Sequence, residues 1–163
     1  MGSGVWVMGT QKMRLSASLA AAWEAEKLSI LTLEKLAERA GDRKLKARLL
    51  ARAAGCQAHA SRILARLAAL GGIPMPVPPD DVTVAASLDV ALLDEAERAN
   101  LLAERYTALA NLARKVIDPS AAWVCELNHA EEADRVQELM ELARMAAADL
   151  ELQSRSAFLS PPA

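Results

Sequence analysis

The sequence predicts an all-α protein, a bundle of four helices, and three observations support this prediction. Of the 163 residues, 53% are hydrophobic, 25% are charged and only 3% are aromatic. Ala, Leu, Glu and Arg dominate, and these residues lose little side-chain freedom in a helix. Apolar residues recur at helical spacing in four long segments, as expected for helices with one buried face. Helix-ending residues separate the four segments.

The first two helices are expected at residues 16–40 and 42–70. Gly41 suits the position that follows a helix, because glycine adopts a left-handed backbone without strain. Asp42 can then cap the second helix with its side chain, and Gly71-Gly72 can end it.

The third and fourth helices are expected at residues 87–117 and 118–153. Ser87 is a suitable N-cap for the third helix. Asp118-Pro119 ends the third helix and begins the fourth, with Asp at the N-cap and Pro at the first helical position.

The connections predict how the helices are arranged. The first and third connections are short, so each joins antiparallel neighbours. The middle connection, residues 71–86, contains four prolines and is expected to be an extended crossover. At about 3.1 Å per residue it can run the length of a helix of about 42 Å. We therefore expect two antiparallel hairpins joined by one long crossover.

The remaining features limit the class of protein. Residues 16–155 make one domain, with a disordered extension at 1–15 and a tail at 156–163. The net charge is −2 with no basic stripe, so neither nucleic acid nor a membrane surface is an expected partner. No apolar run is long enough to span a bilayer. The cysteines, Cys56 and Cys125, are too few for a disulfide framework, which favours a cytoplasmic protein with reduced thiols.

Each helix has one polar interruption in the stripe expected to face the core. Glu26 interrupts the first stripe and Glu95 the third, while His59 lies one turn beyond Cys56 in the second. On the fourth helix, Glu126 and His129 interrupt a stripe of Ala122, Ala133, Val136, Met140 and Ala143. The two halves also repeat weakly: W-E-A-E-K matches D-E-A-E-R, and C-Q-A-H matches E-L-N-H.

With these motifs the chain resembles the ferritin-like superfamily of carboxylate-bridged di-metal proteins, most closely its rubrerythrin-like branch, over about residues 16–150. In that family two helices each give a Glu and the other two each give Glu-x-x-His. The resemblance therefore implies the metal ligands Glu26, His59, Glu95, Glu126 and His129, with Cys56 in place of a glutamate. Glu24 and Glu97 are alternative ligands if either helix is rotated. Glu104, Glu131 and Glu132 are expected on the solvated outer face.

Cys56 leaves three outcomes open: a thiolate ligand, a single metal, or a lost site with a small core residue. The resemblance implies iron as the cofactor, with manganese or zinc as alternatives, and O2 or peroxide chemistry of the oxidoreductase type. The alternative functions are a catalytically silent helical interaction module and a thiol sensor that uses Cys56 and Cys125.

A homodimer is the expected assembly. Ferritin-like bundles commonly pair, and several apolar residues lie near the chain ends, where the bundle core need not cover them. These residues are Val5, Trp6, Val7, Leu15 and Phe158.

Overall fold

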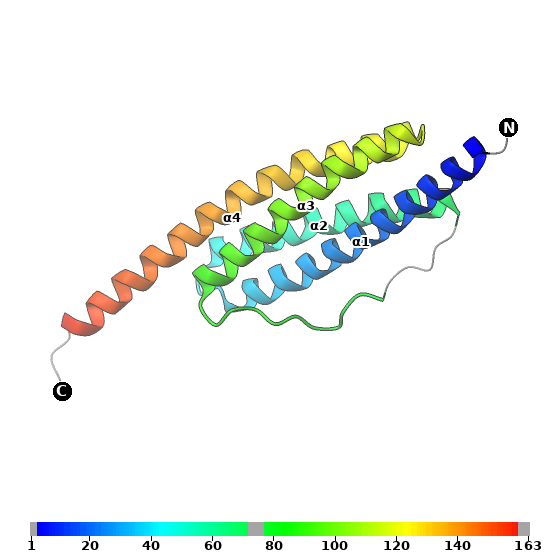
Figure 1. Cartoon of the computed structure of the whole chain (residues 1–163). Coiled ribbons are helices and arrows are strands. Elements are labelled where there is room, and N and C mark those ends of the chain that lie inside the picture. The colour runs from blue at the N-terminus through cyan, green and yellow to red at the C-terminus, as the bar shows by residue number, and fades with distance from the viewer. Residues whose placement is uncertain (1–2, 72–76, 160–163) are drawn as a thin grey trace.

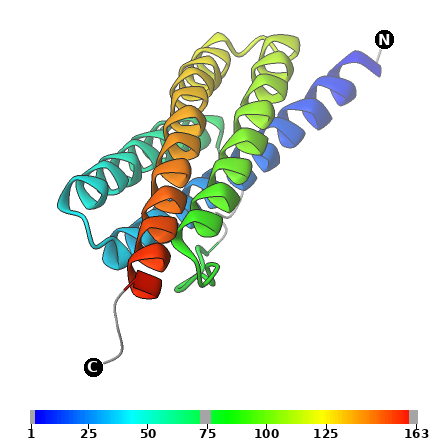
Figure 2. The ribbon, with the colours of Figure 1, turned by 90° about the vertical axis from the view of Figure 1, so that its left-hand side faces the viewer.

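The computed structural model describes residues 3–71 and 77–159, with side chains described from residue 8 onward. Its elements are four long helices, α1 (Ser3–Arg39), α2 (Arg43–Leu70), α3 (Leu88–Lys115) and α4 (Pro119–Leu159). α1 packs on α2 and α3, and α4 packs on α3 and α2. Two antiparallel hairpins therefore form a four-helix bundle (Figures 1 and 2), as the sequence predicts.

The predicted helix boundaries match the observed ones closely at the two capped ends. The Asp42 side chain accepts a hydrogen bond from the backbone N–H of Leu45, and Gly71 ends α2 in a left-handed conformation with φ of 77°. Asp118 caps α4 by accepting a hydrogen bond from the backbone N–H of Ala121. Ser87 occupies the N-cap of α3 but makes no capping hydrogen bond with its side chain.

The crossover is attached to α1. Lys35 donates to the carbonyl oxygen of Val82 at 2.6 Å and pairs with Asp81 at 3.0 Å, while Arg39 donates to the carbonyl of Ala85. The described part of the crossover thus runs beside α1 (Figure 1), and α2 and α3 are parallel. Residues 72–76, which hold two of the prolines, lie outside the described residues.

The chain ends differ from the prediction. α1 begins at Ser3 and α4 continues to Leu159, where the sequence indicated disorder at 1–15 and a frayed tail from 156. On α1, Leu15 is fully buried, which stabilises helix in the segment before residue 16. On α4, the next proline after Pro119 is Pro161, so no proline ends the helix before Leu159. The last turns of α4 extend beyond the other helices (Figure 1), and Phe158 there is 91% exposed.

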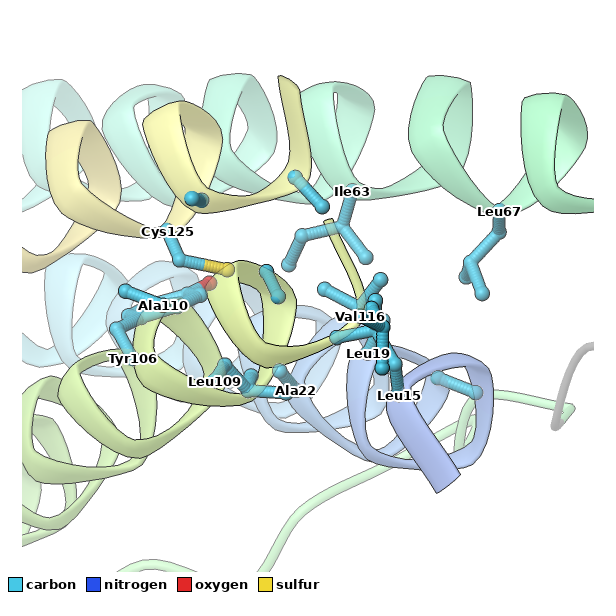
Figure 3. Packing of buried hydrophobic residues seen from close by; sticks show 14 of the residues in the cluster. Leu15, Leu19, Ala22, Ile63, Leu67, Tyr106, Leu109, Ala110, Val116 and Cys125 are labelled. Carbon is cyan, nitrogen blue, oxygen red and sulfur yellow. The ribbon is translucent and has the colours of Figure 1, made fainter. Parts of the chain in front are cut away.

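Two apolar clusters fill the bundle. One contains Leu19, Ile63, Tyr106 and Cys125, and side chains from all four helices meet in it (Figure 3). The other contains residues that include Leu33, Leu49, Cys56, Leu92 and Leu139. On α1 and α4, buried charged residues lie between the members of these two clusters: Glu26 on α1, and Glu132 and Arg135 on α4. Among the described residues, no helix is long and apolar enough to cross a membrane.

Candidate metal centre

A layer of buried polar side chains crosses the middle of the bundle, and every helix contributes to it. These side chains are at most 2% exposed, a level of burial that ionisable residues reach only when they are paired. They are Glu26 of α1, His59 of α2, Glu95 and Tyr106 of α3, and Asn128, Glu132 and Arg135 of α4.

His59 lies at the centre of this layer, with carboxylates on both sides of its ring. Its Nδ1 atom is 3.0 Å from Glu26 Oε1 and 3.0 Å from Glu132 Oε1, and its Nε2 atom is 2.7 Å from Glu131 Oε2. Burial disfavours the charged imidazole, but hydrogen bonds with Glu132 and Glu26 outweigh it and raise the pKa of His59 to about 9. Without a metal ion, the ring therefore carries a proton on both nitrogens near neutral pH.

Glu26 has one satisfied and one unsatisfied oxygen. The Tyr106 hydroxyl donates to Glu26 Oε1 at 2.7 Å, and the same oxygen faces His59. The other oxygen, Oε2, is buried without a hydrogen-bond partner among the described residues. A buried carboxylate oxygen without a partner is costly, so this atom has an unused capacity to bind a cation.

Arg135 provides the layer with a fixed positive charge. Its Nη2 donates to Glu132 Oε2 at 2.6 Å, and its Nη1 lies 3.3 Å from Glu95 Oε1 and 2.7 Å from Cys56 Sγ. Burial opposes the charge, but the neighbouring carboxylates Glu132 and Glu95 outweigh it and raise the pKa of this guanidinium. Arg135 remains charged and neutralises part of the buried negative charge.

Glu95 is a fully buried carboxylate between two arginines. Burial raises its pKa, although the positive charges of Arg135 and Arg98 and a hydrogen bond with Ser29 oppose that rise. Arg98, one turn along α3, reaches Glu95 Oε2 at 2.8 Å from a position that is 39% exposed. Glu95 therefore faces one arginine inside the core and another at its rim.

An opening between α2 and α4 leads to this layer. The pocket has a volume of about 310 Å³, and Gly55, Cys56, His59, Arg62, Glu131 and Arg135 are among its lining residues. Arg62 binds Glu131 at 2.7 Å and lowers the pKa of that carboxyl group. His59 and Arg135 thus border this opening, whereas Glu26 and Glu132 do not line it.

The structure places three of the six predicted ligands, Glu26, His59 and Glu95, in the layer, and a fourth, Cys56, beside it in contact with Arg135. Glu26, His59, Glu95 and Cys56 are at most 2% exposed and lie near one another, as the stripes of α1, α2 and α3 predict. Glu24 and Glu97, the alternatives, are exposed.

The prediction that Glu126 and His129 face the core is wrong. Glu126 is 49% exposed and pairs with Arg114 on the surface, and His129 Nδ1 donates to the carbonyl oxygen of Ala103 at 2.9 Å beside a shallow groove. The inward stripe of α4 is shifted by about one position. Its centre line is formed by Cys125, Asn128, Glu132, Arg135, Leu139, Leu142 and Ala146, while Ala122, Val136 and Ala143 of the predicted stripe are also buried.

Glu132 and Arg135 are the residues that sequence reasoning missed. Glu132 was expected on the outer face and Arg135 was not among the candidate residues, whereas their side chains are 0% and 2% exposed. Leu139 and Leu142, both buried, could have indicated the correct inward face of α4. Four residues before Leu139 is Arg135, and three residues before Arg135 is Glu132, so all four lie on one face of the helix.

α2 and α4 bring their central residues together in matched pairs. His59 contacts Glu132, and Cys56, three residues earlier on α2, contacts Arg135, three residues later on α4. The spacing in both helices is that of Glu-x-x-His, with Cys56 at one glutamate position and Arg135 at one histidine position. One ligand of each kind is therefore missing, and these residues do not fit a di-metal centre.

One ligand group remains complete. Glu26, His59 and Glu132 each offer an atom, and these atoms all lie within 4.8 Å of one another. It is the single such group of three or more residues found in the described part of the chain.

The two thiols are buried in different clusters and are both free. Burial raises the pKa of Cys125 to about 12, and it raises that of Cys56 further, against the influence of Arg135. Neutral buried thiols react slowly, so the geometry gives little support to a thiol sensor.

Comparisons with known proteins agree with the fold. A crystal structure of a protein from Xanthomonas campestris has a TM-score of 0.78 at 21% identity, covering 89% of this chain and 99% of that chain. A bacterioferritin of Desulfovibrio desulfuricans, described by its diiron site, has a TM-score of 0.75 at 18% identity, covering 84% and 82%. Neither protein-family models nor curated proteins give a match. The chain thus has the ferritin-like four-helix bundle fold.

Proposed function

We propose that the chain is a metal-binding protein that holds a divalent transition-metal ion between Glu26, His59 and Glu132. The observation that supports this function most directly is the convergence of three buried ligand atoms from α1, α2 and α4 within 4.8 Å. Two carboxylates and one imidazole are a ligand set that suits iron, manganese or zinc.

The surroundings of His59 support the same proposal. A histidine that binds a metal through one nitrogen normally donates its other ring N–H to a carboxylate, which fixes the tautomer. Glu131 accepts from Nε2 at 2.7 Å, and Arg62 holds Glu131 in place. Nδ1 is then the nitrogen left for the metal, on the side of Glu26 and Glu132. Glu26 Oε2, which is buried without a hydrogen-bond partner among the described residues, is a further oxygen atom that can bind the metal.

Iron is our first choice of metal, since the bacterioferritin that shares the fold is described by its diiron site. Bound iron supplies one-electron chemistry with O2 or peroxide, and we propose an oxidoreductase activity of that type. The protein's own contribution is to exclude bulk water from the site and to hold the ligands in place. The Arg135 guanidinium engages Cys56 Sγ, so we propose no thiolate ligand.

A second function is a catalytically silent helical interaction module. The observation that favours it is that His59 and Arg135 already place positive charges beside Glu26, Glu95 and Glu132. Such a charge network holds the bundle together without a metal. The two functions differ in one property, because only a protein that binds metal in its native state gains stability from it.

Metal content and thermal stability together test the proposal. Protein purified without chelators is reconstituted anaerobically with Fe²⁺, Mn²⁺ or Zn²⁺, and bound metal and Tm are measured. We expect about one ion per chain and a rise in Tm, both abolished in Glu132→Gln. Glu126→Gln, on the same helix but exposed, is the matched control and should behave as wild type. Less than about 0.2 ions per chain for every metal, with no rise in Tm, would favour the silent module.

A homodimer is the assembly that we propose. The apolar residues that predicted it have different fates: Leu15 is buried within the chain, Phe158 is exposed, and the side chains of residues 5–7 lie outside those described. Light scattering at tens of micromolar tests this, and a monomer mass would refute it.

A further inference from the structure

Cys56 and Arg135 are the two departures from the di-metal pattern, and they contact each other. Their atoms Sγ and Nη1 are 2.7 Å apart in the core. α2 and α4 run antiparallel, so the missing glutamate on one helix lies opposite the missing histidine on the other. The two departures from the pattern therefore lie at one place in the core.

The Arg135 guanidinium interacts with residues at the ligand positions. It bonds to Glu132 through Nε and Nη2, at 3.0 and 2.6 Å, and reaches Glu95 and Cys56 through Nη1. In the di-metal pattern these helix positions supply metal ligands. A planar cation with several donors can satisfy such oxygens as a metal ion does.

We propose that the Arg135 guanidinium takes the place of one of the two metal ions of a ferritin-like centre, so that the core holds one divalent ion. This inference rests on the proposed function for its remaining ion. Residues Glu26, His59 and Glu132 keep that ion, and Glu95 is committed to arginine, with Arg135 on one oxygen and Arg98 on the other.

Formal charges agree with a single ion. The di-metal pattern has four carboxylates, whose four negative charges match two divalent ions. Among the fully buried side chains, which leave out the partly exposed Arg98, Glu26, Glu95 and Glu132 contribute three negative charges and Arg135 one positive charge. This leaves two negative charges when His59 binds the ion as a neutral imidazole. One divalent ion neutralises the layer. A second ion would leave two uncompensated positive charges in the core, which is costly.

A metal-binding experiment tests this inference by comparing the number of ions bound per chain in wild type and in a double variant. Cys56→Glu combined with Arg135→His restores both Glu-x-x-His motifs. After anaerobic reconstitution with Mn²⁺ or Fe²⁺, we expect about one ion per chain in wild type and about two in the double variant. Arg114→Gln is the matched control, since Arg114 also lies on α3 but pairs with Glu126 on the surface, and it should keep the wild-type number.

The outcomes separate this inference from the proposed function. Two ions in wild type, or no gain in a folded double variant, would overturn the role of Arg135. No ion in wild type would refute the proposed function, and a gain in the double variant would then still support the inference.

A single substitution gives a second readout. Arg135→Gln should lower Tm in the absence of metal and show a larger rise in Tm with Mn²⁺ than wild type, because metal replaces the lost charge. Equal rises in both proteins contradict the inference. If Arg135→Gln does not fold even with metal, the wild-type ion count decides.

Discussion

The two nitrogens of His59 face different kinds of carboxylate. Nε2 lies 2.7 Å from Glu131, which is 41% exposed and bound to Arg62, whereas Nδ1 lies 3.0 Å from the fully buried Glu26 and Glu132. Glu131, the outer carboxylate, can orient the imidazole ring. Glu26 and Glu132, the inner carboxylates, can then bind the same cation as Nδ1. The site thus has a supporting residue outside the ligand group.

Glu131→Gln tests this supporting role. The amide accepts a weaker hydrogen bond from Nε2–H than a carboxylate does, so His59 becomes a poorer ligand. We expect metal affinity to fall about 10-fold or more while the number of ions per chain is unchanged. Competition with a metal-binding dye measures the affinity. Glu126→Gln is the control, and an affinity of Glu131→Gln equal to that control would exclude the role.

Tyr106→Phe tests the hydrogen bond that holds Glu26. The Tyr106 hydroxyl is fully buried and donates to Glu26 Oε1 at 2.7 Å, so its removal leaves that carboxylate with less support. We expect the free energy of unfolding of the metal-free protein to fall by about 1.5–3 kcal/mol. Urea unfolding measures this loss, and a change within error would show that Glu26 does not depend on the hydroxyl.

The sequence predicted the fold and the inward faces of three helices, because their apolar stripes are continuous apart from single polar residues. On α2, the buried residues Leu49, Ala53, Cys56, Ala60, Ile63 and Leu67 follow helical spacing. The chain ends were harder to predict, since the apolar residues of 3–15 show no clear helical spacing, although the helix continues through them.

α4 could not be predicted in the same way, because its inward face carries three consecutive polar residues of the stripe, Asn128, Glu132 and Arg135. An apolar stripe cannot be found where the buried residues are polar. The charges are tolerated because they pair across the bundle, and such pairing depends on contacts between helices that no single helix encodes. The Glu-x-x-His motif at Glu126 and His129 therefore predicted the wrong inward face of α4.

Glu138 predicts a pH dependence of stability away from the metal centre. Burial opposes ionisation of Glu138, but hydrogen bonds from Arg48 and Arg52 outweigh it and lower the pKa of this carboxyl group. A lowered pKa gives stability that is present above the unfolded value of about 4.5 and is lost as the pH falls through the folded value.

Glu138→Gln should therefore reduce the free energy of unfolding by about 1 kcal/mol at pH 7, a modest loss because solvent screens the two partly exposed arginines. The difference from wild type should shrink below about pH 4.5. Urea unfolding across the pH range checks both parts. A difference that stays constant down to the lowest pH would contradict the assigned ion pairs.

Ile117 offers a stabilising substitution at the turn between α3 and α4. Its φ is 60°, in the left-handed region that β-branched residues avoid, and its side chain is 79% exposed. The backbone N–H of Asp118 bonds to the carbonyl of Ala113, and that of Ile117 bonds to the carbonyl of Arg114. This is the helix-ending pattern in which glycine is preferred at the position of Ile117.

Ile117→Gly should raise the free energy of unfolding by about 0.5–1 kcal/mol. The left-handed conformation costs a residue with a side chain about 1–2 kcal/mol, and the greater freedom of glycine in the unfolded chain offsets part of the gain. Ile117→Ala is the control, because it removes the same exposed side chain but keeps a Cβ atom, and it should gain less. Thermal and urea unfolding measure the three proteins. Equal stabilities of the glycine and alanine variants would show that Ile117 is not strained.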